Sequence, residues 1–221
     1  MAALPFRTVE EGSDTMIRMP EQARFILMYV VFPLWVAAGL ADWVCHRRTG
    51  IALTSGLKEN LLHLLMYLEI GVGMLAVALL EIDAAVLLLV FAVFVVHQLT
   101  VYWDLHYSTL LRDVGPFEQM VHSFLELLPL FSLGLLAMLA WPQAQAIVHV
   151  GDDVADWSLR AKQQPLPPTY VLAALVSSLV FNALPLLQET LSCLFAKRGP
   201  ERAAAAPRGE LRREPHLEPR L

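Results

Sequence analysis

Five long apolar blocks are the feature that most constrains what this chain can fold into. They cover residues 25–45, 57–80, 84–103, 117–141 and 170–195. A transmembrane helix needs about 20 mostly apolar residues, so each block is long enough to cross a bilayer. Backbone groups in hydrocarbon must find partners inside their own segment, and the alternation typical of a membrane β-strand is absent from the sequence. The blocks therefore predict an all-α polytopic membrane protein with five transmembrane helices.

The composition excludes two other classes of protein. Of the 221 residues, 57% are hydrophobic and 17% are charged, whereas a soluble domain carries about 25% charged residues. A single-domain soluble enzyme is excluded on that ground. The formal net charge of -5 also argues against nucleic acid as a partner.

The distribution of Lys and Arg predicts how the chain is oriented. We divide it into a polar N-terminal segment at 1–24, a transmembrane domain at 25–196 and a disordered basic tail at 197–221. The link between the first two blocks carries Arg47, Arg48 and Lys58 without an acid, and the tail carries seven basic residues. Cytoplasmic segments are enriched in Lys and Arg. We therefore expect a multi-pass protein of the cell inner membrane with its N-terminus outside and its C-terminus in the cytoplasm.

Four of the blocks carry a carboxylate and a histidine at helical spacing. The pairs are Asp42 and His46, Glu59 and His63, His97 and Asp104, and Glu118 and His122. Spacings of four and seven residues place both members on one helix face. A charge at the centre of a bilayer costs at least about 2.5–3.5 kcal/mol, so such residues indicate a functional site.

The predicted topology brings the four pairs to one depth. They close the first and third blocks and open the second and fourth, so all of them fall in the cytoplasmic half of the membrane. We expect the first four helices to form a bundle around this intramembrane polar site. The fifth, whose candidate polar groups are Asn182 and Glu189, is expected to pack alongside or to mediate assembly.

The eight residues of the pairs are suitable ligands for two transition-metal ions. Imidazole and carboxylate ligands without thiolate indicate Fe, with Zn or Mn as alternatives. Metal binding would also offset the cost of burying these groups. We expect Glu126 and Glu69 to act as a bridging ligand or a base, and His106 to act as a spare ligand or proton shuttle.

The leading interpretation is a non-haem di-iron oxidoreductase that takes a lipid or other hydrophobic substrate from the inner leaflet and electrons from a donor. A membrane zinc hydrolase of lipids is one alternative, because metal-bound water has a pKa near 7 and Glu126 could serve as its base. A metal or proton transporter is a second alternative, and a structural or partner-binding membrane protein is a third.

The ligand types resemble those of the ferritin-like di-iron carboxylate bundles. Those bundles use Glu-x-x-His, whereas Glu59 and His63, like Glu118 and His122, have the spacing Glu-x-x-x-His. The strings DWVCHR, ENLLHLLM and EQMVHSFLE, within residues 25–140, resemble a family of uncharacterised bacterial integral-membrane proteins. That resemblance implies a membrane fold and no particular activity.

Overall fold

The computed structural model describes residues 20–196. Within that range the chain is helical throughout its regular elements, and its only β-type pairing is an isolated bridge between Leu80 and Ala161. The predicted tail at 197–221 and the predicted polar segment up to residue 19 lie outside the described residues.

The helices follow the apolar blocks closely. Residues 20–26 are helical and continue into the π-helical η1 and then α2, and a π-helical η3 joins α7 to α8. The elements are η1 (Leu27–Val31), α2 (Phe32–Thr49), η2 (Ile51–Leu53), α3 (Leu57–Leu79), α4 (Ala84–Thr109), α5 (Pro116–Leu139), α6 (Trp141–Ile147), α7 (Pro168–Ser178), η3 (Leu179–Ala183) and α8 (Leu184–Phe195).

Five helical segments are long and apolar enough to cross a membrane. They are Pro20–Thr49, Leu57–Leu79, Ala84–Thr109, Pro116–Leu139 and Pro168–Phe195. The all-α, five-span, multi-pass class predicted from the sequence is thereby confirmed. The first span begins five residues before the predicted block, and α4 continues to Thr109, so that Asp104 and His106 lie inside a helix.

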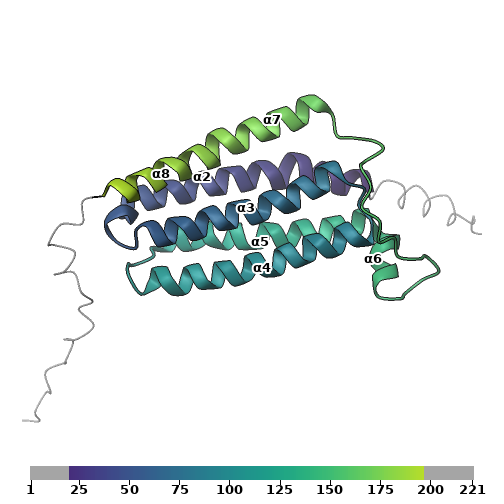
Figure 1. Ribbon diagram of the computed structural model, residues 1–221, viewed down its shortest axis with the longest axis horizontal. Helices are drawn as coiled ribbons and strands as arrows, with labels where there is room; N and C mark the ends of the chain where they lie inside the picture. Colours follow the sequence, from purple (N-terminus) through teal and green to yellow (C-terminus); the bar gives the residue numbers. More distant parts are fainter. Residues whose placement is uncertain (1–19, 197–221) are drawn as a thin grey trace, which may run out of the picture.

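The spans form one bundle with a defined layout. The helices α2, α3, α4 and α5 lie side by side, and the fifth span, made of α7, η3 and α8, lies along α2 and α3 (Figure 1). The turn from α2 to α3 and the turn from α4 to α5 are at the same end of the bundle (Figure 1). The carboxylate–histidine pairs adjoin these two turns, which is why the helices bring them together.

Glycine makes the first of these turns possible. The helix α2 ends at Gly50, which adopts the left-handed conformation with φ 67° and donates its N–H to the His46 carbonyl. A second glycine, Gly56, precedes α3 with φ 70° and ψ -149°, a conformation that other residues rarely adopt. The chain thus reverses within seven residues, and the C-terminal turns of α2 face the first turns of α3.

The two halves of the bundle have different interiors. One half is packed by an apolar cluster of Ala23, Val31, Leu128 and Leu135, with Trp35 against it. The other half buries most of the polar side chains of the bundle, including Glu59 at 0% and His46 at 1% exposure. The polar half is the one bounded by the two turns described above.

Candidate metal centre

Two helices build a compact cluster of four ligand-type side chains, which we call cluster A. It comprises Asp42 and His46 of α2 and Glu118 and His122 of α5, whose ligand atoms all lie within 4.8 Å of one another. The Nε2 atom of His122 lies 2.9 Å from Asp42 Oδ1, and His46 Nε2 lies 3.5 Å from both Asp42 Oδ1 and Glu118 Oε1. The i,i+4 spacing on each helix places both members on the face toward the other helix.

A second cluster, cluster B, adjoins the first. It comprises His46, Glu59 and His63, again with ligand atoms within 4.8 Å. The rings of His46 and His63 are stacked, with centroids 4.5 Å apart. On its other side His63 places Nε2 3.2 Å from Asp104 Oδ2 of α4. Clusters A and B therefore share His46 and, together with Asp104, form one continuous site between four helices.

Arg112 is a part of the site that the carboxylate–histidine pattern does not predict. It lies in the turn between α4 and α5, its side chain is 3% exposed, and its Nη2 is 2.5 Å from Glu59 Oε1 and 2.6 Å from Glu118 Oε1. Its Nε also donates to Glu59 at 3.1 Å. Burial opposes the charged form, but the hydrogen bonds to Glu118 and Glu59 outweigh it and raise the pKa of the guanidinium above its usual value. Arg112 is therefore a permanent cation that fixes one carboxylate from each cluster.

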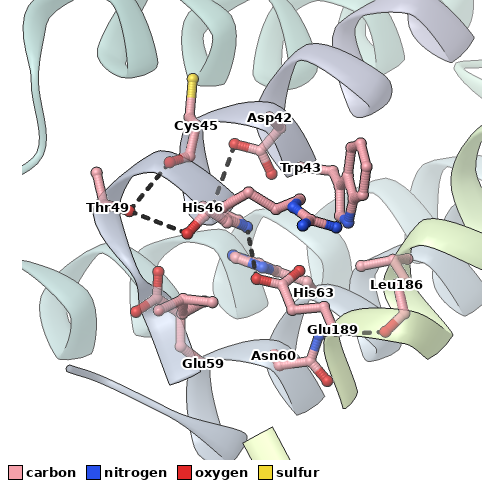
Figure 2. A network of polar contacts seen from close by, with 12 residues as sticks. Asp42, Trp43, Cys45, His46, Thr49, Glu59, Asn60, His63, Leu186 and Glu189 are labelled. Atoms are coloured by element: carbon pink, nitrogen blue, oxygen red, sulfur yellow. Dashed lines mark hydrogen bonds and ion pairs between the residues drawn. The ribbon is translucent and has the colours of Figure 1, made fainter. Parts of the chain in front are cut away.

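The fifth span also reaches the site. Glu189 of α8 is 3% exposed and places Oε1 3.3 Å from His46 Nδ1. Figure 2 shows the His46 ring between Asp42 on one side and Glu189 on the other. The fifth span packs alongside the bundle as expected, but it also contributes a buried carboxylate. Glu189 was noted from the sequence as a polar group and was not assigned to the site.

His97 occupies a different position from the one predicted. It was expected to join Asp104 as a ligand pair, but its Nδ1 lies 3.3 Å from Glu69 Oε2, and Glu69 Oε1 accepts a 2.7 Å hydrogen bond from Thr100. The helices α3 and α4 are antiparallel, so the residue seven positions before Asp104 meets the residue six positions after His63. Glu69 and His97 thus form a separate pair farther from the two turns, and His97 belongs to neither cluster A nor cluster B.

The remaining predicted site residues, Glu126 and His106, lie in different surroundings. Glu126 is half-buried, lies one turn beyond His122 and lines a cavity between the helices. His106 is exposed and its ring stacks on that of Tyr102, with centroids 6.3 Å apart. Two residues along a helix correspond to about 200° of rotation, so His106 lies on the face opposite Asp104. The structure does not bring His106 to the site.

Many buried polar atoms of the site lack a hydrogen-bond partner within the described chain. They are His46 Nδ1 and Nε2, His63 Nδ1, His122 Nδ1, Asp104 Oδ1, Glu118 Oε2 and both carboxylate oxygens of Glu189. Only a few such atoms per 100 residues are usual in a native structure. His46 Nδ1 and Glu189 Oε1 lie 3.3 Å from each other, and the concentration of the remaining atoms at one place fits a site whose lone pairs are directed at cations.

The formal charge of the site also fits the binding of cations. Five buried or nearly buried carboxylates surround it, and Arg112 is the one guanidinium among them within the described residues. The carboxylates are those of Asp42, Glu59, Asp104, Glu118 and Glu189. With neutral imidazoles the formal charge is -4, which two divalent cations would balance. An uncompensated charge of this size is very costly away from water.

A cavity of about 100 Å³ opens from the site into the bundle. Its polar end includes Asp42, His63 and His122, and its wall includes the apolar side chains Met66 and Leu125. All five spans contribute to the lining. A water needs roughly 10–15 Å³ measured in this way, so the cavity has room for several waters or for a small part of a substrate.

Comparison of the chain with family models, with curated proteins and with solved structures found no match.

Proposed function

We propose that this multi-pass membrane protein is a metal-dependent oxidoreductase with two adjoining metal positions. The observation that carries the proposal is cluster A, in which Asp42, His46, Glu118 and His122 meet from two helices in a buried setting. The second position would use Glu59 and His63 of cluster B together with Asp104. The charge of the site, which two divalent cations would balance, supports two ions rather than one.

Iron is the metal that we propose, with zinc or manganese as alternatives. The clusters contain imidazole and carboxylate groups, which suit these ions and not a thiolate-bound centre. Cys45 is a near neighbour in sequence, but its sulfur points away from the His46 ring (Figure 2). When bound, two iron ions would supply the redox chemistry that reduces dioxygen.

The substrate that we propose is a lipid or another hydrophobic molecule. The cavity joins a polar end to an apolar wall inside a lipid-facing bundle, which suits a hydrocarbon chain. In a hydroxylation, dioxygen, two electrons and two protons convert a C–H bond to C–OH and release one water, so an external electron donor is required. The chain would contribute Arg112 to hold Glu59 and Glu118 in place, and Glu126 to deliver a proton from the cavity wall.

A zinc hydrolase of lipids is the second candidate, and the observation that favours it is the position of Glu126. This carboxylate lines the cavity one turn from His122. It has no hydrogen-bond or ion-pair partner within residues 20–196. A free carboxylate beside a metal-bound water is what a general base requires.

A transporter is less well supported. The polar residues gather in one half of the bundle, whereas Val31, Leu128 and Leu135 pack the other half with apolar side chains. A continuous polar path would have to cross that cluster.

The inner membrane, with the site on the cytoplasmic side, is the location that we propose. The basic residues Arg47, Arg48 and Lys58 adjoin the α2–α3 turn, at the same end as clusters A and B. By the positive-inside rule this end faces the cytoplasm. Labelling of an Arg48→Cys variant only after permeabilisation would support this orientation, and labelling in intact cells would contradict it.

Elemental analysis of the detergent-purified protein tests the function directly. We expect about two equivalents of iron per chain, reduced in both His63→Ala and His122→Ala. His106→Ala is the matched control, since it removes an exposed histidine of the same bundle and should keep the metal. Zinc in place of iron would favour the hydrolase. A wild-type protein that is free of metal and binds none on addition would overturn both.

A further inference from the structure

We infer that the fifth span completes the metal centre, with Glu189 of α8 as the positioning residue that makes His46 bind metal through Nε2. This inference rests on the proposed metal site. It assigns a role to a carboxylate that belongs to a helix outside the four that carry the ligand pairs.

The two nitrogens of His46 face different groups. Nε2 lies 3.5 Å from Asp42 Oδ1 and from Glu118 Oε1, both members of cluster A. Nδ1 lies 3.3 Å from Glu189 Oε1. Glu189 itself belongs to neither cluster among the described residues. Nε2 of His46 is therefore directed at the ligands of cluster A, and Nδ1 is directed at a carboxylate outside that cluster.

The chemistry of imidazole indicates what Glu189 does for His46. A neutral histidine carries one N–H, and its other nitrogen offers a lone pair. A proton on Nδ1 can be donated to Glu189, which leaves the lone pair of Nε2 for a metal. In metal sites a carboxylate commonly holds the second N–H of a ligating histidine, and this fixes the tautomer and the orientation of the ring. Both oxygens of Glu189 lack any other hydrogen bond within the described chain, so its carboxylate is available for this contact.

Several contacts hold α8 at the height that this role needs. Asn60 of α3 is fully buried, accepts a 2.6 Å hydrogen bond from Thr190 and donates to the Leu186 carbonyl at 3.5 Å. Asn182 of η3 donates to the Val36 carbonyl of α2 at 3.3 Å. Asn182 and Glu189 are seven residues apart, so both face the bundle. The π-helical turn η3 lies between the two helical halves of the span, and such turns are frequent at functional sites.

The experiment uses Zn²⁺ as a diamagnetic probe of the full chain in detergent. We expect Glu189→Ala to weaken Zn²⁺ binding about 10- to 100-fold, and Glu189→Gln, whose amide oxygen can still accept from Nδ1, to weaken it less. The control is Leu187→Ala, which removes an exposed side chain of α8 two residues before Glu189 and should leave the affinity unchanged.

A second readout does not depend on whether Glu189→Ala folds. In ¹⁵N-histidine NMR spectra of the Zn²⁺-loaded wild type, assigned with His46→Gln, we expect His46 to be protonated at Nδ1 and bound to zinc through Nε2. Zinc bound through Nδ1, or full affinity in Glu189→Ala, would overturn the inference and leave the proposed metal site intact. A wild type that binds no Zn²⁺ and no iron would instead overturn the proposed function.

Discussion

The rings of His46 and His63 stack with centroids 4.5 Å apart and planes 6° from parallel. One ring comes from the last turns of α2 and the other from the first turns of α3, which the Gly50 turn brings together. Each ring has its own carboxylate partners, Asp42 and Glu118 for His46 and Asp104 for His63. The stack therefore places the two proposed metal positions beside each other.

If the positions are distinct, they can be emptied separately. Asp42→Asn keeps the shape of the side chain and removes a ligand charge from cluster A, and Asp104→Asn does the same beside His63. We expect each variant to lose about one of two equivalents of iron, measured by elemental analysis against protein concentration. Full occupancy in both variants would contradict the assignment of these carboxylates.

Arg112 should be essential to the metal-free protein. Its removal leaves Glu59 and Glu118 buried without their cation, and breaking a buried ion pair costs about 3–5 kcal/mol. We expect Arg112→Gln to lower the thermal unfolding temperature of the apoprotein in detergent, and added metal to recover part of the loss. Arg160→Gln is the control, since the Arg160–Asp156 pair is largely exposed and should contribute little. An Arg112→Gln apoprotein as stable as the wild type would contradict this account.

The contribution of Arg112 should not depend on pH in the ordinary range. Burial lowers the pKa of Arg112, but the hydrogen bonds to Glu118 and Glu59 raise it by a larger amount. The pKa in the folded protein therefore lies above that in the unfolded chain. A raised pKa contributes stability that is complete below the unfolded value and is lost only above it. We expect the stability difference between wild type and Arg112→Gln to be constant from about pH 7 to about pH 10. A decline of this stability difference between about pH 7 and about pH 10 would mean that the titration of another group determines the strength of the ion pairs of Arg112.

Gly39 should be needed for the fifth span to dock. A Cβ at this position would lie 2.1 Å from Asn182 Nδ2, whereas a Cβ at Gly71 meets nothing within 4 Å. We expect Gly39→Ala to displace Asn182, destabilise the protein and weaken metal binding through Glu189. Gly71→Ala should be neutral or slightly stabilising, because alanine is favoured over glycine inside a helix by about 0.5–1 kcal/mol. If Gly39→Ala and Gly71→Ala had equal effects on the unfolding temperature and on metal affinity, the close contact between α2 and η3 would be contradicted.

The sequence predicted what depends on local periodicity. The five spans follow from apolar length, and the pairing of Asp42 with His46 or Glu118 with His122 on one face follows from helix geometry. The common depth of these pairs followed from the positions of Lys and Arg. None of these inferences required knowledge of how the helices pack.

What the sequence did not predict depends on packing between helices. Arg112 lies in a turn and becomes part of the site only because α4 ends and α5 begins beside Glu59. His97 pairs with Glu69 because α3 and α4 run antiparallel with a particular offset. Glu189 reaches His46 because η3 and α8 dock on α2 and α3. The only signal for Glu189 in the sequence was an acidic residue in an apolar block.

X-ray absorption at the iron edge of the purified, iron-loaded protein tests the central claim most directly. We expect a first shell of nitrogen and oxygen atoms, outer-shell scattering from imidazole, and a second iron at about 3.5–4 Å. The imidazole scattering should decrease in His122→Ala and not in His106→Ala. A sulfur shell, or iron that is removed by gel filtration without a change in the unfolding temperature, would contradict the metal centre built from Asp42, His46, Glu118 and His122.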